Sequence, residues 1–146
     1  MESGNRVETK RKSDVTIAIP AIDSNAPGLL YAYLPTEHQT GLPFHINGDF
    51  FPSSDRKRVL LDTTDYQQRW NEAAIRAAAK VFSINCLAVR DFLGGKAFWG
   101  ALEKLEQVAR EADDQKQNPA FGEFWSALKL CLPVLEVVKT ADGTWK

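Results

Sequence analysis

The chain has 146 residues, 44% of them hydrophobic and 25% charged, and a formal net charge of -1 at pH 7. This balance suits a single soluble domain with a sizeable core and argues against a protein that coats nucleic acid by bulk charge. No apolar stretch approaches the roughly 20 residues of a membrane span, and the N-terminus lacks the apolar core of a signal peptide. We therefore expect a cytoplasmic protein without a membrane partner. Cys86 and Cys131 stand apart in apolar, helical surroundings, which indicates two buried thiols.

The N-terminal part of the chain predicts a polar head followed by β-strands. Residues 1–13 are polar and indicate a disordered head or an interdomain linker. Runs of β-branched and aromatic residues bounded by turn residues predict strands at 15–19, 29–34, 44–51 and 59–61. Residues 36–41 indicate a polar loop that contains His38.

Within the strand expected at 44–51, alternation puts His45 and Asn47 on the face opposite Phe44 and Ile46. Gly48 marks a bulge or a close approach. Asp49 shares the face of His45, but a metal site would need a third ligand that the sequence does not place. A hydrogen-bonded or exposed polar face is the simpler expectation, and no metal site is predicted.

Helical spacing of apolar residues predicts three helices in the rest of the chain. Thr64 and Gln67 fit a capping box, which would begin a helix of about 28 residues that Gly94-Gly95 stops. Phe98 and Leu102 belong to the apolar stripe of a second helix. Asn118 and Pro119 are typical of the start of a third helix. We expect the aromatic residues of these last two helices to pack in the core: Phe98, Trp99, Phe121, Phe124 and Trp125.

The fold class expected from these elements is α+β, with a small, mostly antiparallel sheet followed by a three-helix region. The division that we predict is a head at 1–13, an α/β domain at 14–93 and a helical extension at 94–146. Residues 134–138 and 141–143 after the third helix indicate a strand and a hairpin turn. Because the returning strand would have only just begun at the last residue, we expect the chain to be a piece of a larger protein.

The most informative segment for function is residues 52–58, Pro-Ser-Ser-Asp-Arg-Lys-Arg, which we call the basic turn. It follows an apolar strand and carries the adjacent cations Arg56, Lys57 and Arg58. Charge at the end of a rigid element suits an anion such as phosphate, which Ser53 and Ser54 could also contact. A run of charges on its own is more often a solvated surface. No Ser/His/Asp signature and no Gly-rich phosphate loop before a helix accompanies it.

Several segments resemble one family of large ATPases. In sacsin and related proteins, an ATPase domain of the heat-shock-chaperone-90 (GHKL) type is followed by a segment of this appearance. The parts that carry the resemblance are Leu34-Pro35, Thr40 to Phe50, Ser53 to Lys57 and Trp70 to Ile75, with a weaker likeness at Leu132-Pro133 and Thr140 to Trp145. The family pattern has Ser-x-Asn-Arg-Arg where this chain has Ser54-Asp55-Arg56-Lys57, so Asp55 adds a negative charge beside the proposed anion contact.

The resemblance implies the transducer or middle domain of a chaperone-like ATPase, similar to the second domain of ribosomal protein S-five. In that class, a loop of this domain sends a cation to the γ-phosphate of ATP. By position Arg56 takes that role, with Lys57 and Arg58 as alternates. ATP and Mg would belong to an upstream nucleotide-binding domain of the same protein, which would be the main partner, and a protein client would be a further one. We expect no cofactor for this chain alone and no ATP turnover by it.

Two other functions stay open from the residues alone. The clusters Lys10-Arg11-Lys12 and Arg56-Lys57-Arg58 would suit a nucleic-acid-binding module of the same fold, although the net charge argues against it. The aromatic helices after residue 94 would suit a purely structural domain that docks a neighbour.

Overall fold

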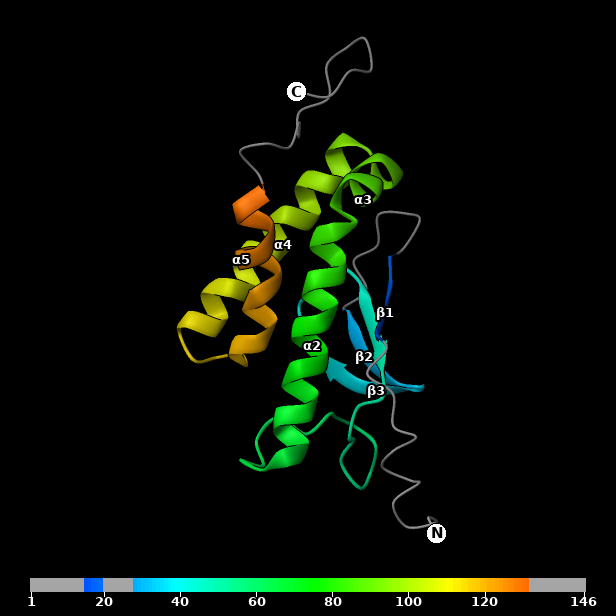
Figure 1. Ribbon diagram of the computed structural model, residues 1–146, viewed down its shortest axis with the longest axis vertical. Coiled ribbons are helices and arrows are strands. Elements are labelled where there is room, and N and C mark those ends of the chain that lie inside the picture. Colours follow the sequence, from blue (N-terminus) through cyan, green and yellow to red (C-terminus); the bar gives the residue numbers. More distant parts are fainter. Residues whose placement is uncertain (1–14, 20–27, 132–146) are drawn as a thin grey trace.

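The computed structural model describes residues 15–19 and 28–131. Figure 1 shows a small sheet packed on one side of a long central helix, with further helices on the other side. The head expected at 1–13 and the strand and hairpin turn expected after residue 133 lie outside the described residues. None of the described helices is both long and apolar enough to cross a membrane.

The sheet is mixed, so the expected α+β class is confirmed but its mostly antiparallel character is wrong. Its strands, in the spatial order β1-β4-β2-β3, are β1 (Val15–Ala18), β4 (His45–Gly48), β2 (Leu29–Ala32) and β3 (Leu34–Gln39). The two outer pairs are antiparallel, whereas β2 and β4 at the centre run parallel. The reason is an additional strand. The chain reverses direction after β2 to form β3 and reverses again before β4. As a result, β4 runs in the same direction as β2 and lies beside it.

That additional strand replaces most of the polar loop expected at 36–41, and it places His38 on a strand. The chain turns sharply at Tyr33, whose φ of 67° lies in the left-handed region, so that Ala32 pairs with Leu34. Thr36 faces inward and its hydroxyl donates to the carbonyl oxygen of Leu30 at 2.7 Å. Polar residues can form this strand because it lies at the edge of the sheet, where only some side chains are buried.

Gly48 and Gly28 both lie where the chain packs closely. A Cβ atom at Gly48 would stand 3.2 Å from the Phe50 ring, which confirms the close approach expected there. At Gly28, a Cβ atom would stand 2.3 Å from the carbonyl oxygen of Phe44 and 2.4 Å from that of Leu42. Only glycine fits that position, because both neighbours are main-chain atoms.

The single long helix expected before Gly94 is two helices, α2 (Tyr66–Ile84) and α3 (Cys86–Leu93). Asn85 separates them: its backbone leaves helical geometry (φ -100°, ψ 15°) and its side-chain amide donates to the Val81 carbonyl at 2.8 Å. The Val81 carbonyl also accepts from the Asn85 N–H at 3.1 Å, so the side chain shares this acceptor with the main chain at the point where α2 ends. Gly94, with φ of 81°, then ends α3 as predicted.

The capping box expected at Thr64 and Gln67 is wrong, because the N-cap of α2 lies one residue later. Asp65 is the N-cap of α2, and its carboxylate accepts from the backbone N–H groups of Gln67 at 3.0 Å and Gln68 at 3.3 Å. Thr64 cannot be the cap because its backbone is left-handed (φ 56°), whereas an N-cap residue is extended. Its N–H instead donates to the side chain of Gln68 at 2.8 Å.

The last helices follow the expected order. They are α4 (Gly95–Asp113), the 3-10 turn η1 (Pro119–Gly122) and α5 (Glu123–Cys131). Asn118 caps η1 as predicted, by accepting from the N–H of Ala120 at 2.9 Å. The first turn after Pro119 is 3-10 rather than α-helical, which the sequence did not indicate.

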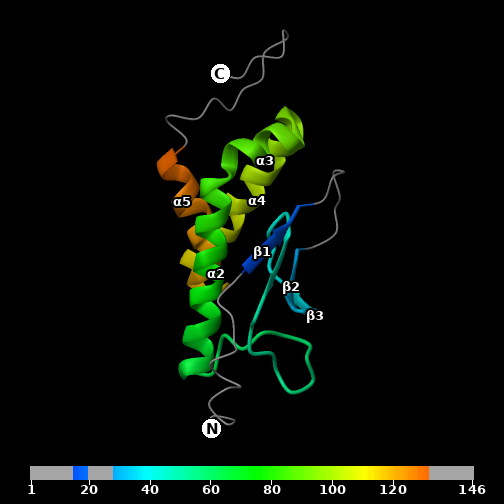
Figure 2. The same ribbon diagram turned by 45° about the vertical axis from the view of Figure 1, so that its right-hand side comes forward.

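One continuous core joins the sheet to the helices. Figures 1 and 2 both show the strands on one side of α2 and α5 on the other, whereas α4 overlaps α2 in Figure 2. Phe44 before β4, Phe82 on α2 and Phe124 on α5 form a cluster with ring centroids 5.1, 5.2 and 6.0 Å apart. Each is at most 2% exposed, and burial of one such side chain contributes about 1.5–3 kcal/mol.

Most of the other packing expectations hold. Phe98 and Phe121 are fully buried as predicted, and Cys86 is buried. Trp125 is partly buried against the core. Trp99 is an exception, because 44% of it is exposed. The side chain of Cys131 lies outside the described part.

Candidate functional site at the basic turn

The basic turn is a closed loop at the N-terminal end of α2, drawn below the sheet in Figure 1. Pro52 and Val59 face each other across an antiparallel bridge. The Ser53 N–H donates to the Arg58 carbonyl at 2.8 Å, and the Arg56 N–H donates to the Ser53 carbonyl at 2.8 Å. Arg56 itself has a left-handed backbone (φ 59°), which non-glycine residues adopt uncommonly. The bridge and these hydrogen bonds fix the backbone conformation of the turn.

Asp55 organises this turn from within. One carboxylate oxygen accepts from the Ser53 hydroxyl at 2.6 Å and from the Lys57 N–H at 3.1 Å. The hydrogen bond from Ser53 is the main reason that the pKa of Asp55 is lowered, followed by the one from Lys57. The Ser53 oxygen in turn accepts from the Arg58 N–H at 3.2 Å. The hydroxyl proton of Ser53 is thus engaged with Asp55, whereas Ser54 is exposed.

The cations of the turn have different surroundings. The Arg56 guanidinium donates to the carbonyl oxygen of Ala32, at the end of β2, with a distance of 3.0 Å from Nη2. Arg58 pairs with Asp62 at 3.0 Å, and both side chains are more than half exposed. Lys57 is exposed, and its ammonium makes no hydrogen bond or ion pair shorter than 4 Å with another described residue. The structure thus groups the cations in one turn but directs Arg56 and Arg58 to different neighbours.

The base of the turn is held by two residues of α2. The Trp70 indole N–H donates to the Asp49 carbonyl at 2.8 Å. The Asn71 side chain accepts from the Phe51 N–H at 2.8 Å and donates to the carbonyls of Phe51 at 3.0 Å and Leu60 at 2.8 Å. Because Phe51 and Leu60 also bond to each other at 3.0 Å, Asn71 fastens both legs of the turn at one point.

Sequence reasoning missed this role of Asn71, although a signal was present. Asn71 shares a helical stripe with Ala74, Ile75 and Ala78, which are all buried. A fully buried asparagine on such a stripe must have its amide hydrogen-bonded by partners from another element. Asn71 is 0% exposed. A polar residue within this apolar helical pattern therefore indicates a side chain that holds another segment by hydrogen bonds.

The polar residues of β4 also serve the sheet. His45 Nδ1 accepts from the Leu29 N–H at 3.0 Å, and Asn47 accepts from the Tyr33 N–H at 3.0 Å. The expectation of a hydrogen-bonded polar face is therefore confirmed. Among the described residues, no three His, Cys, Asp or Glu side chains come together in a way that could hold a metal.

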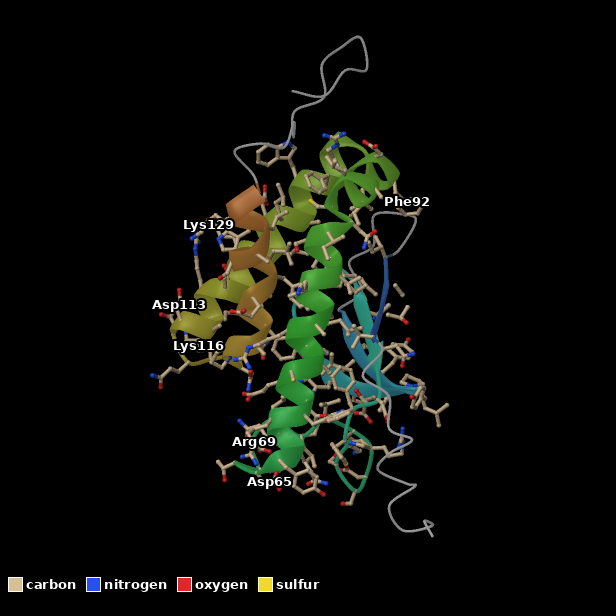
Figure 3. The ribbon with its side chains drawn as sticks, viewed as in Figure 1. Asp65, Arg69, Phe92, Asp113, Lys116 and Lys129 are labelled. Carbon is tan, nitrogen blue, oxygen red and sulfur yellow. The ribbon has the colours of Figure 1, made fainter. Side chains whose placement is uncertain are left out.

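A pocket of about 370 Å³ lies beside the basic turn, between the turn and the α4–η1 connection. Its lining residues are His38, Arg58, Val59, Leu61, Asp62, Gln115, Lys116, Gln117 and Asn118. His38 Nδ1 accepts from the Val59 N–H at 3.1 Å, so the neutral ring carries its proton on Nε2. Burial, and then the charge of Arg58, lower the pKa of His38. In Figure 3, Lys116 extends outward from the α4–η1 connection.

Comparison with known proteins gives one partial likeness. A segment of 49 residues, 34% of this chain, is 45% identical to human sacsin. The matched segment is only 1% of sacsin's length. No model of a protein family matches the chain. No solved structure matches it significantly.

Proposed function

We propose that this chain is the transducer domain of a chaperone-like ATPase, in which the basic turn supplies a cation to the γ-phosphate of ATP. The nucleotide, with its Mg, would be held by an upstream domain of the same protein. The observation that carries the proposal is the rigid presentation of Arg56 and Lys57 on a turn that Asn71 fastens to α2. The likeness of part of the chain to sacsin supports it.

A cation in this position has two effects on ATP hydrolysis. It stabilises the negative charge that spreads over the phosphoryl oxygens in the transition state, and a preorganised group does so without rearrangement. It also makes the position of the domain depend on whether the γ-phosphate is present, which converts hydrolysis into domain movement.

Arg56 is the first choice for this cation. Its contact with Ala32 uses one N–H of Nη2, and the guanidinium has further donors for phosphate oxygens. Lys57 is the first alternate because its ammonium is exposed and unpaired among the described residues. Arg58 is the second, since contact with phosphate would compete with its pairing to Asp62.

The test is steady-state ATP turnover by the natural protein that contains this chain. Arg56→Ala should lower kcat by about 100-fold or more, as loss of one preorganised charge-stabilising group does. Lys57→Ala and Arg58→Ala should each have a smaller effect. Arg76→Ala, which removes an exposed arginine from α2, is the matched control and should leave kcat unchanged. Full turnover by Arg56→Ala would reject Arg56 as the cation.

A second test uses the isolated chain. Because the nucleotide and Mg would be held elsewhere, the isolated 146-residue chain should not hydrolyse ATP. Saturable ATP turnover by the purified chain would contradict the proposal.

A further inference from the structure

The pocket beside the basic turn has the size and the lining of a site for a small molecule. Its volume of about 370 Å³ lies towards the lower end of the range for ligand pockets in proteins. Val59 and Leu61 give it apolar surface, whereas Arg58, Asp62 and Lys116 bring charge to it. Apolar surface beside a few polar groups is the usual lining of a site that binds an organic ligand.

One wall of the pocket is fixed to strand β3. The Val59 N–H donates to His38 Nδ1 at 3.1 Å, and the Glu37 N–H donates to the Lys57 carbonyl at 2.8 Å. These two hydrogen bonds join the second leg of the basic turn to the edge of the sheet. Because Val59 is also fully buried, this wall has a fixed position.

The opposite wall is the α4–η1 connection, which is also held in place. The Gln117 side chain donates to the carbonyl of Thr40, directly after β3, at 3.0 Å. The Asn118 side chain donates to the Glu72 carboxylate on α2 at 2.9 Å. Both walls are therefore attached to the rest of the fold without a ligand, and binding would require little additional ordering.

His38 brings a hydrogen-bond donor to the pocket. Its Nδ1 accepts from the Val59 N–H, so the proton of the neutral ring is on Nε2. That N–H makes no hydrogen bond with any described residue. Among the described residues, no polar side-chain atom is buried without a partner, so the Nε2–H must be open to solvent. Since His38 lines the pocket, a ligand there can accept from it.

The charged residues of the pocket favour an anion. The cations Arg58 and Lys116 line it, and the carboxylate among the described lining residues is that of Asp62, so positive charge is in excess. Arg58 pairs with Asp62 through Nη1 at 3.0 Å, and its guanidinium keeps other N–H groups for a second acceptor. Lys116 extends outward in Figure 3 and forms no ion pair with another described residue. Its long side chain can reach an anion by rotation about its own bonds.

We propose that this pocket binds a small organic anion, which carries a carboxylate or phosphate group on an apolar body. The anionic group accepts from the Nε2–H of His38 and from Arg58, with Lys116 as a mobile countercharge. The apolar body lies against Val59 and Leu61. This inference does not depend on the role proposed for Arg56, because it requires neither ATP nor an upstream domain.

Benzoate and phenyl phosphate are the probes, and two-dimensional NMR of the purified 146-residue chain measures their binding. At least one probe should shift the N–H signals of Val59 and Gln117 in a saturable way, and the probe that binds identifies the anionic group. Benzamide lacks the charge and acetate lacks the apolar body, so each should bind at least about tenfold more weakly. Saturation by neither probe, shifts confined to other parts of the chain, or equal binding of benzamide would overturn the inference.

His38→Asn tests the histidine donor separately from the fold. An asparagine oxygen can accept from the Val59 N–H in place of Nδ1, whereas the Nε2–H is removed. The variant should keep the dispersed NMR spectrum of the parent chain and bind the better probe about tenfold more weakly. Parent affinity in this variant would show that His38 takes no part and would overturn the site.

Lys116→Ala and Lys80→Ala form a matched pair of exposed lysines. Lys116 lines the pocket, whereas Lys80 lies on α2 outside its lining. Lys116→Ala should weaken binding of the better probe by a few-fold, and Lys80→Ala should leave it unchanged. An equal loss in both variants would mean that the probe responds to the overall charge of the chain, and the inference would fail.

Discussion

Asn71 and Phe51 are joined by two reciprocal hydrogen bonds. The Asn71 side-chain amide bonds both main-chain polar groups of Phe51, as the backbone of a neighbouring strand would. The Asn71 Oδ1 atom accepts from the Phe51 N–H at 2.8 Å, and its Nδ2 atom donates to the Phe51 carbonyl at 3.0 Å. The same Nδ2 group reaches the Leu60 carbonyl at 2.8 Å. Asn71 therefore fixes both legs of the basic turn to α2, in addition to the hydrogen bond from Trp70 to the Asp49 carbonyl.

The first prediction concerns this side chain. Asn71→Asp keeps an acceptor for the Phe51 N–H but replaces a donor by an oxygen that faces two carbonyls. We expect the free energy of unfolding to fall by about 3 kcal/mol, because buried acceptors lose their donor and a buried charge is left unpaired. Urea unfolding of the isolated chain measures this difference.

The control for Asn71→Asp is Gln115→Glu, the same chemical change at an exposed residue. It should alter the free energy of unfolding by less than about 0.5 kcal/mol. A loss at Asn71 no larger than that of the control would show that the amide does not anchor the turn.

The second prediction concerns Gly28. Gly28→Ala would place a Cβ atom 2.3 Å from the Phe44 carbonyl oxygen, and the backbone would have to move to remove the overlap. We expect destabilisation of about 2–3 kcal/mol or more, measured by thermal or urea unfolding.

Gly100→Ala is the matched control for Gly28, since a Cβ atom at Gly100 meets nothing within 4 Å. Gly100 lies inside α4, so alanine there should stabilise the chain by about 0.5–1 kcal/mol. The two substitutions should thus act in opposite directions. Equal effects would mean that the close approach at Gly28 is absent.

Much of the helical part could be predicted because its signals are local. The apolar spacing and the breaks at Gly94 and Asn118 are contained within a few residues of sequence, and the structure follows them. The break at Asn85 was harder to predict, since the side-chain hydrogen bond from Asn85 to the Val81 carbonyl is not evident from the residue type. Asparagine occurs in helix interiors often enough that its identity alone does not end a helix.

The sheet was less predictable because its order depends on contacts between distant segments. The segment that forms β3 contains Pro, Thr, Glu, His and Gln, and polar composition indicated a loop. It is a strand because Thr36 bonds inward to Leu30 and because an edge position tolerates polar side chains. The reversal at Tyr33 could not be predicted either, since a tyrosine with positive φ is rare.

The cations of the basic turn could be predicted as a group but not individually. Their sequence indicates charge on a turn, yet the partner of Arg56 is the carbonyl of Ala32, 24 residues away. Such a contact depends on the tertiary path of β2, which no local pattern contains.

The third prediction concerns the charge of Asp55. Asp55→Asn retains an oxygen that can accept from the Ser53 hydroxyl and the Lys57 N–H, so the turn should keep its shape. If the basic turn supplies a cation to ATP as proposed, removal of a negative charge beside the cations should raise ATP turnover of the natural protein by a few-fold. Steady-state turnover at saturating ATP measures the effect.

Asp113→Asn is the control for Asp55, because it removes an exposed carboxylate at the end of α4. It should leave turnover unchanged. A large loss of turnover in Asp55→Asn, with the fold intact by circular dichroism, would mean that the carboxylate itself is needed and would contradict the electrostatic argument.

The fourth prediction concerns pH. Burial and the charge of Arg58 hold the pKa of His38 below its ordinary value of 6.5. As pH falls below 6.5, the unfolded chain binds a proton on this histidine before the folded chain does. The contribution of neutral His38 to the free energy of unfolding is therefore complete above pH 6.5. It is lost as pH falls towards the lower pKa of His38 in the folded chain.

Removal of the imidazole tests this effect. His38→Gln should flatten the decline of the free energy of unfolding as pH falls below 6.5, compared with the parent chain. Charged neighbours Arg58 and Asp62 remain in both proteins, so their contribution is common. Parallel pH profiles for the two chains would show that His38 does not contribute.

The mixed order of the sheet sets the sequence in which the fold can assemble. Only β2 and β3 pair between near neighbours in the chain, whereas Val15 of β1 pairs with Gly48 of β4. A chain emerging from the ribosome must therefore expose β1 without a partner until β4 is synthesised. Contacts between such distant segments slow folding. The β2–β3 hairpin, which carries Tyr33, is accordingly the part of the sheet that can form earliest.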